Sequence, residues 1–245
     1  MPLLIHALIL RPEALGGLSS ALQHIGDVTG AGPLELVAVK DAGAVAVPLE
    51  KVPSPPSQEE LLRYADAVEQ LAALATILPM RFGSTAASPE ELLRMLSANR
   101  DPILAALERV EGRVEYSLRI LAPGDDGAHP RDLEGSVPDA LSGGGIQREY
   151  LRRKYQAHRQ AEQLSREATE LREELKLKLS ALDPSMQFVL SDASAFLVDL
   201  SILIRRPAAA GLGPVFDLFG KEHPERPLMV TGPWPPYTFS SLTIQ

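Results

Sequence analysis

One long segment of regular apolar spacing constrains the fold of this chain more than any other feature. Between Ile146 and Leu182, apolar residues recur in alternating steps of four and three, and Asp183-Pro184 then ends the pattern. This spacing is typical of a helix with a coiled-coil-like stripe, so we expect one long helix here. The stripe comprises Ala157, Ala161, Leu164, Ala168, Leu171, Leu175 and Leu182.

Short strand patterns surround this helix. Val114–Leu121 alternates as a strand, and a 24-residue loop, Ala122–Gly145, follows it with six glycines and three prolines. A loop of that length is either functional or mobile. After the long helix we expect strands at Met186–Leu190 and Ala195–Ile204, a helix through Val215–Phe219 and a strand at Leu228–Thr231. The resulting order, βαββαβ, is that of ferredoxin-like folds.

The first half of the chain predicts a looser mixture of strands and helices. We expect a buried strand at Pro2–Leu10, at most one short helix within Gly16–Gly32, and a hairpin of Leu34–Lys40 with Ala44–Leu49 around the turn signal Asp41-Ala42-Gly43. The fold class is therefore α+β in two domains, residues 1–111 and 112–245, the second ferredoxin-like.

Three helix starts are marked in the first half. Ser57 and Glu60 form a capping box, Ser88 and Glu91 form another around Pro89, and Asp101-Pro102 opens a third helix that Gly112 closes. The first of these helices places an apolar stripe on one face. That stripe comprises Leu61, Ala65, Val68, Leu71, Ala72 and Ala75.

Composition excludes several classes of function. The 245 residues contain no cysteine, which rules out disulfides, thiolate metal sites and cysteine nucleophiles, and makes the cytosol the default compartment. A formal net charge of -8 argues against a nucleic-acid partner. The apolar run at the start of the sequence stops at Arg11, too early for a membrane span. We expect a soluble protein without a cofactor.

Residues suited to chemistry are few. The five histidines have no metal-binding spacing, and no nucleophile or phosphate-binding motif occurs. Asp125, Asp126, His129 and Asp132 cluster in the long loop, which leaves open a hydrolytic enzyme, although a solvated acidic loop is favoured. A basic run opens the long helix and indicates a solvated face or a contact with an acidic partner. It comprises Arg148, Arg152, Arg153, Lys154 and Arg159.

Two segments break ordinary rules of composition. The LPMRFGS segment, residues 78–84, sets an arginine between a proline and an aromatic-glycine pair, so we expect Phe82 in the core, Gly83 in a special backbone conformation and Arg81 paired. The closing strap, TGPWPPYTF at residues 231–239, must be extended. We expect it to lie over its own domain with Trp234, Tyr237 and Phe239 as anchors.

Both segments resemble signatures of the gas vesicle accessory family GvpL/GvpF. The residues that carry the resemblance are Leu78, Pro79, Arg81, Phe82 and Gly83, then Thr231, Gly232, Pro233, Trp234, Pro235, Pro236, Tyr237 and Phe239. Glu115, Gly145, Tyr150-Leu151 and Ala195–Val198 fall in family order between them. Ser84 replaces a commoner threonine, and Asp66 stands near an expected histidine.

The resemblance implies a non-enzymatic role in the cytoplasm, associated with the gas vesicle. It implies a partner, the small and very hydrophobic shell protein, whose aggregation the family limits during assembly, together with other gas vesicle accessory proteins. It also implies two α+β domains. No nucleic acid, lipid membrane or cofactor is expected.

If this chain covers the apolar surface of a shell subunit, it must offer a contact surface of its own. We expect that surface on the long helix or a sheet face beside it, with Arg148, Arg152, Arg153, Leu164, Leu171 and Leu175 as candidate contacts. Arg81 and Trp234 are expected to be chiefly architectural. A small-molecule-binding regulatory module of ferredoxin-like type remains the alternative.

Overall fold

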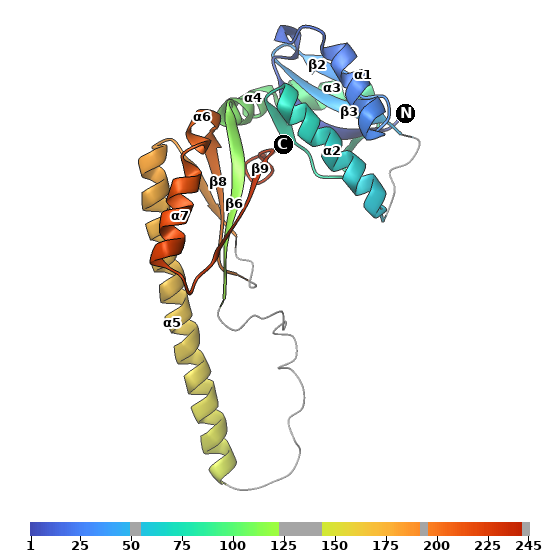
Figure 1. Cartoon of the computed structure of the whole chain (residues 1–245). Coiled ribbons are helices and arrows are strands. Elements are labelled where there is room, and N and C mark those ends of the chain that lie inside the picture. The colour runs from blue at the N-terminus through green and yellow to red at the C-terminus, as the bar shows by residue number, and fades with distance from the viewer. Residues whose placement is uncertain (50–54, 123–143, 192–195, 242–245) are drawn as a thin grey trace. The chain divides into compact units, whose positions relative to one another are not determined.

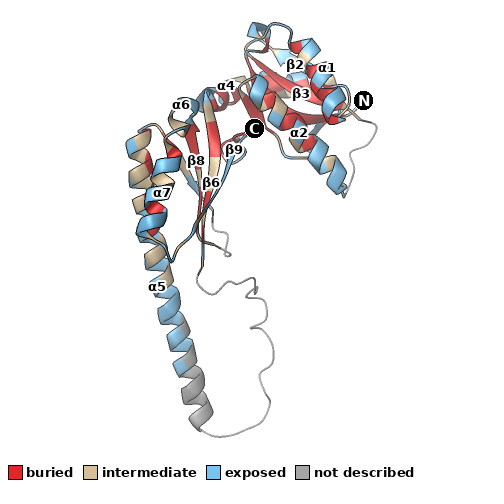
Figure 2. Cartoon of the chain, in the orientation of Figure 1, coloured by how far each residue is buried: buried red, intermediate tan, exposed pale blue. Residues whose placement is uncertain are grey.

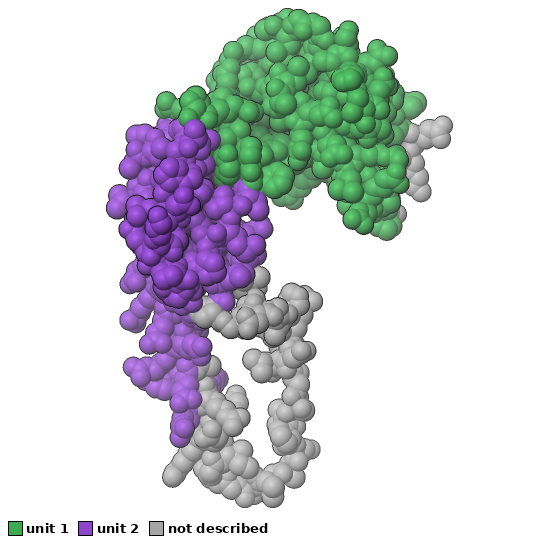
Figure 3. Space-filling model, in the orientation of Figure 1, with its two compact units in different colours: residues 1–116, 203–207, 232–245 green, residues 117–202, 208–231 purple. Residues whose placement is uncertain are grey.

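The computed structural model describes residues 1–49, 55–122, 144–191 and 196–241. The chain divides into two compact units (Figure 3). Unit 1 contains residues 1–116, 203–207 and 232–245, and unit 2 contains residues 117–202 and 208–231. The predicted division at residue 112 stays a prediction, and the units differ from it because the end of the chain belongs with unit 1.

Unit 1 is built on an antiparallel five-stranded sheet (Figure 1). Strand β1 (Leu3–Leu10) pairs with β3 (Ala42–Pro48) on one side and with β4 (Ile77–Pro79) and β5 (Thr85–Ala86) on the other. Strand β2 (Glu35–Val39) pairs with β3 and forms one edge of the sheet. The predicted hairpin is present, but its turn is Lys40-Asp41, because Lys40 adopts a positive φ of 50° and Ala42 already pairs with Val39.

The helices of unit 1 begin where the sequence marks them, with two differences. Helix α2 (Gln58–Leu74) carries the complete Ser57/Glu60 capping box, and α3 (Pro89–Ala98) is capped by the Ser88 hydroxyl. Helix α4 (Arg100–Val110) begins before the predicted Asp101 and lacks a side-chain cap. The short helix η1 (Pro12–Ala14) precedes a full helix, α1 (Leu18–Thr29), in the glycine-rich stretch.

Two apolar clusters lie on opposite faces of this sheet. One contains buried residues of α3 and α4, and the other contains buried residues of α1 and α2. A register shift between Ile5 and Ala7 changes the alternation of β1, so Ile5 and Leu8 face the first cluster while Ala7 faces the second. A β-bulge at this point explains how residues of both parities reach both cores.

The predicted stripe of α2 is rotated in the structure. Leu61 is 42% exposed, and the buried positions are Tyr64, Ala67, Val68 and Leu71. The reason is that the phenol of Tyr64 reaches β1, which centres the buried face of the helix on that residue.

Most of the second sheet lies in unit 2. Its strands are β6 (Arg113–Leu121), β7 (Gln187–Leu190), β8 (Phe196–Arg205) and β9 (Leu228–Trp234), in the spatial order β7-β8-β6-β9. The helices are α5 (Gly144–Leu182), the short α6 (Arg206–Ala209) and α7 (Leu212–Glu222), and α5 packs on α7. Mixed helix and sheet in both units makes the chain an α+β protein.

Helix α5 uses only its C-terminal part in the core of unit 2. Leu171, Leu175 and Leu179 are buried, whereas the described side chains from Arg152 to Gln163 are exposed (Figure 2). The buried residues follow steps of four, so the expected coiled-coil stripe is wrong beyond Leu175. Leu179 takes the core position and Lys178 pairs with acidic neighbours. Among the residues that the structure describes, no helix combines the length and apolar character that crossing a bilayer requires.

Candidate functional site

The LPMRFGS segment begins on the sheet of unit 1 and then turns away from it. Leu78 and Pro79 pair with Leu8 and Ala7 of β1, and the Met80 backbone N–H donates to the His6 carbonyl at 2.9 Å. The chain reverses where the Ser84 N–H donates to the Arg81 carbonyl at 3.0 Å, with Gly83 at φ 91° as expected for its position in such a turn. The segment therefore forms a tight corner.

Tyr64 links this corner to β1 and to helix α2. Its hydroxyl donates toward the carbonyls of Ile5 and Met80, both at 2.9 Å, and its ring stacks on His6 with centroids 4.4 Å apart. The Phe82 and Tyr64 rings pack in a T-shaped arrangement with centroids 5.2 Å apart, which supports the predicted packing of Phe82 against the core. Burial raises the pKa of the Tyr64 hydroxyl far above its usual value and lowers that of His6 to about 4. His6 is therefore neutral near pH 7.

Arg81 departs from its predicted role. Its side chain is exposed, and it forms no ion pair or hydrogen bond with the described part of the chain. The expected pairing of Arg81 is therefore not found among the described residues, because its side chain lies in solvent at the corner. An exposed guanidinium beside a rigid corner is available to a partner.

The closing strap, except for Thr231, belongs to unit 1. It starts on β9, where Gly232 has φ 127° and precedes a cis peptide bond to Pro233. A Cβ atom on Gly232 would lie 2.8 Å from the Glu115 carbonyl oxygen and 2.9 Å from the Tyr116 ring. Only glycine fits this close approach of the strap to β6.

Three contacts hold the end of the strap in place. The buried Glu115 carboxylate accepts hydrogen bonds from the N–H and the hydroxyl of Thr238, Arg109 donates to the Phe239 carbonyl at 2.7 Å, and the Phe239 ring is buried. Phe239 lies in the same apolar cluster as Leu78, so the LPMRFGS segment and the closing strap contribute to one core although they are far apart in sequence. Of the three predicted anchors, only Phe239 is fully buried.

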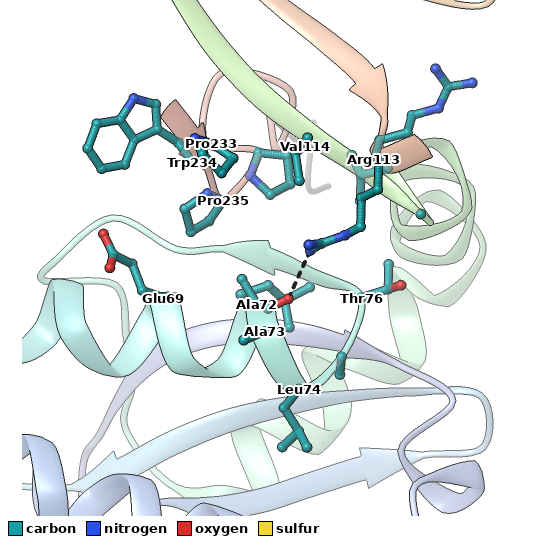
Figure 4. Close-up of a pocket in the computed structure, with 16 residues that line it drawn as sticks. Glu69, Ala72, Ala73, Leu74, Thr76, Arg113, Val114, Pro233, Trp234 and Pro235 are labelled. Carbon is teal, nitrogen blue, oxygen red and sulfur yellow. Dashed lines mark hydrogen bonds between the residues drawn. The ribbon is translucent and has the colours of Figure 1, made fainter. Parts of the chain in front are cut away.

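The strap forms one wall of a groove in unit 1, which we call the strap groove (Figure 4). It has a volume of about 550 Å³. The opposite wall is the C-terminal end of α2 with the start of β4, and Val110, residues 112–114 and Arg206 close it. Trp234 is 41% exposed and Leu74 is 37% exposed on its rim, whereas Pro235 and Pro236 are buried. The lone tryptophan is therefore presented on a rigid support.

Charged groups lie at both ends of the strap groove. Glu69 lies near Trp234, and Arg113 lies at the other end (Figure 4). Arg206 donates to the Ala72 carbonyl at 3.2 Å, a bond drawn as the dashed line in Figure 4. Partial burial and then the Glu69 carboxylate raise the pKa of Tyr237 to about 12. The groove thus combines apolar contact area with polar ends, as binding sites do.

The predicted partner residues on α5 are not brought into one patch. Leu171 and Leu175 are buried inside unit 2, so their proposed contact with a partner is wrong for this structure. Arg152 is exposed and Leu164 is half-buried, whereas the side chains of Arg148 and Arg153 lie outside the described residues. The loop residues Asp125, Asp126, His129 and Asp132 also lie outside them.

Among the described residues of unit 2, three side chains form a cluster that resembles a metal site. Ligand atoms of Glu174, Glu222 and His223 lie within 4.8 Å of one another. The Lys178 ammonium already lies 2.8 Å from Glu222 and 3.5 Å from Glu174, and His223 Nε2 lies 3.0 Å from Glu174. This cluster is an ion-pair network that joins α5 to α7.

Sequence reasoning missed the strap groove because its walls are joined only in three dimensions. The signal that could have indicated it was the coincidence of one tryptophan with three prolines in the strap. The predicted residues of that segment do form a wall of the groove, while the side chain that lies opposite them on the rim, Leu74, carries no mark in the sequence.

Comparison with known proteins identifies the family of the chain. The family model described as "Gas vesicle synthesis protein GvpL/GvpF" matches residues 9–241. Two proteins of Streptomyces sp. (strain CB03234) are similar in sequence. "Gas vesicle protein F" is 26% identical over 93% of this chain and 92% of its own length, and "Gas vesicle protein L" is 28% identical over 85% and 81%.

Two crystal structures share the fold. Gas vesicle protein GvpF from Anabaena sp. PCC7120 aligns with a TM-score of 0.67 at 17% identity, covering 99% of this chain and 97% of that one. GvpF from Microcystis aeruginosa aligns with a TM-score of 0.65 at 12% identity, covering 98% and 99%. Because the family model spans both the LPMRFGS segment and the closing strap, the chain belongs to the GvpL/GvpF family of gas vesicle synthesis proteins.

Proposed function

We propose that this protein is a gas vesicle accessory or minor structural protein that binds the hydrophobic shell protein. In this role it supports nucleation and assembly of the vesicle and limits aggregation of shell subunits. Membership of the family supports a gas-vesicle-related role. The observation that carries the binding role is the strap groove, whose exposed Trp234 and Leu74 lie on a frame of prolines.

The strap groove suits an apolar segment of a shell subunit. Tryptophan and arginine are the residues that most often dominate protein interfaces, and a support that is ordered before binding reduces the entropy lost on association. Trp234 and Leu74 supply the apolar contact, and Arg113 and Arg206 place positive charge at the other end. The exposed part of α5 near Arg152 is a second candidate surface, as the sequence predicts.

The architecture is part of this proposal. We interpret the second sheet with α5 and α7 as a ferredoxin-like unit, because its order β7-β8-β6-β9 places the first and third strands of a βαββαβ series at the centre. Two domains, divided near residue 112, remain our interpretation of the chain. The proposed role consists of binding and requires no catalytic residue or cofactor.

Co-expression with the shell protein tests the binding role directly. The fraction of shell protein that stays soluble is expected to rise with this chain and to fall again with Trp234→Ala plus Leu74→Ser. Leu218→Ser is the matched control, since Leu218 is 49% exposed on α7 and outside the groove. A soluble fraction no higher than with an unrelated protein would refute the chaperone role.

A small-molecule-binding regulatory role is the second candidate. The volume of the strap groove, about 550 Å³, lies within the range of small-ligand sites. Native mass spectrometry of the protein purified from cells would detect a retained ligand. A ligand lost on Trp234→Ala would favour this role over binding of the shell protein.

A further inference from the structure

Strand β2 leaves one edge of the unit 1 sheet open. It is the terminal strand of that sheet, and its sequence, ELVAV, contains no proline and no lysine. Natural edge strands usually carry such residues, or are covered, because an open edge pairs with other strands. Within the strand itself this edge lacks both of these protective residues, and the nearest lysine, Lys40, lies in the turn that follows.

The direction of the free peptide groups follows from the hairpin. Val39 pairs with Ala42 across the two-residue turn, and a pair that flanks such a turn exchanges hydrogen bonds. The pattern alternates, so Val37 also bonds to β3, while the N–H and C=O groups of Leu36 and Ala38 point outward. In the described part of the chain, no other segment hydrogen-bonds to Leu36 or Ala38.

A second groove lies beside this edge. It has a volume of about 770 Å³ and is lined by Leu15 before α1, by Leu18 at the start of that helix, and by Leu36, Ala38 and Lys40. Leu36 is 36% exposed and Ala38 is also exposed. The helix therefore leaves this side of β2 uncovered, and an added strand would place side chains in the groove.

We propose that the occupant of this edge is a second copy of the chain, paired antiparallel through β2 about a two-fold axis at Val37. In this register Leu36 of each copy lies opposite Ala38 of the other, and both have outward peptide groups, so the two copies exchange four hydrogen bonds. Opposite residues lie on the same face of a sheet. Leu36 of one copy therefore enters the groove of the other above the small Ala38.

Charge favours the same register. Glu35 and Lys40 lie at opposite ends of the β2 edge, and neither forms an ion pair with another residue that the structure describes. Antiparallel pairing brings Glu35 of each copy to the Lys40 end of the other. The edge is thus complementary to itself in both size and charge, and this interaction does not depend on the proposed binding of the shell protein.

Sedimentation of the full-length protein over a range of micromolar concentrations tests the proposal. The parent is expected to form a dimer. Lys40→Glu places two negatively charged groups at each end of the paired edge, where Glu35 of one copy and Lys40 of the other had opposite charges, and is expected to raise the dimer dissociation constant about tenfold. Adding Glu35→Lys to that variant restores the dimer. Asp27→Lys on α1, also an acidic-to-basic change, leaves it intact.

Two results would overturn the proposal. One is a parent protein that stays monomeric at high concentration, even if a different protein pairs with β2. The other is failure of the double charge exchange to restore what Lys40→Glu removes. Ala38→Pro would block the pairing by removing an outward N–H, but a proline within the strand also disturbs folding. Hydrogen exchange of the unmodified chain therefore provides the independent measurement.

Hydrogen exchange has an internal control in the alternation of β2. The amides of Val37 and Val39 bond to β3 and are expected to be protected at every concentration. The amides of Leu36 and Ala38 are expected to become protected only as the dimer forms. Protection of Leu36 and Ala38 that does not change with concentration would contradict the pairing.

Discussion

Glu115 on β6 binds Thr238 of the strap through both of its carboxylate oxygens. One oxygen accepts from the Thr238 backbone N–H at 2.9 Å and the other accepts from its hydroxyl at 2.5 Å, although the partners are 123 positions apart in the sequence. The carboxylate is buried. This pair fixes the position of the strap and with it the wall of the groove that presents Trp234.

Glu115→Gln is expected to lower the free energy of unfolding by roughly 2 kcal/mol, because hydrogen bonds to a buried charged group are replaced by weaker ones. Urea denaturation measures the change. Glu108→Gln, on the exposed side of α4, is the control and is expected to stay within about 0.5 kcal/mol of the parent. Equal effects at the two sites would show that the strap is not held by Glu115.

Gly232→Ala is expected to destabilise the protein by roughly 1–3 kcal/mol, since an alanine is strained at φ 127° and its Cβ would lie against β6. Thermal unfolding followed by circular dichroism would detect this loss. Gly213 on α7 has open space around it and no positive φ, so Gly213→Ala is expected to be neutral or slightly stabilising.

The stability of unit 1 is expected to fall as the pH drops from about 6.5 to 4. Burial lowers the pKa of His6 from 6.5 to about 4, so in this interval the unfolded chain binds more protons than the folded chain. The full contribution is about 3 kcal/mol. His6→Phe keeps a ring against Tyr64 and removes the proton, so its unfolding free energy is expected to fall less steeply than that of the parent. Parallel curves would contradict the assignment.

Arg226→Lys is expected to cost about 1 kcal/mol in unit 2. Arg226 donates to both oxygens of Glu167 on α5, at 2.5 and 3.1 Å, and this fork lowers the pKa of Glu167. Lysine keeps the charge but loses the two parallel bonds. Arg166→Lys, at the exposed position directly before Glu167, is the matched control. An equal cost at Arg166 and Arg226 would contradict a specific role for the two parallel hydrogen bonds of Arg226.

Arg81→Ala is expected to change the free energy of unfolding by less than about 0.5 kcal/mol, whereas Phe82→Ala should cost roughly 1–3 kcal/mol. The difference arises because Arg81 is exposed while Phe82 packs against Tyr64. Chemical denaturation of both variants tests this contrast. Loss of shell-protein binding in a stable Arg81→Ala variant would assign this residue to the interface and contradict the architectural role that the sequence predicts.

Local signals predict the helices and strands of this protein well, and the packing of the strap poorly. The Ser57/Glu60 pair predicts the start of α2 because a capping box is complete within four residues. Helix α1 gives a weak sequence signal because glycine and serine surround and interrupt it, although Leu18, Leu22 and Ile25 have helical spacing and are buried. No short-range pattern can tell which core receives Phe239, since a proline-rich segment has no periodicity that marks a buried face.

The strap groove shows the same limit. Its residues Trp234 and Pro233 were singled out in the sequence, but Leu74 and Arg206 join them only because the strap returns to unit 1. The predicted contacts at Leu171 and Leu175 failed for a related reason. A regular apolar stripe does not distinguish a surface for a partner from a core position, and here the chain itself covers those residues.

The division of the chain between the units has a consequence for its biogenesis. Residues 232–241 complete the core of unit 1, yet residues 117–202 and 208–231 of unit 2 precede them in the sequence. A ribosome must therefore translate all of unit 2 before Glu115 meets Thr238 and Phe239 enters its cluster. Until then, the nascent unit 1 exposes an unfilled apolar site to chaperones and proteases, and no single cut in the chain yields two complete fragments.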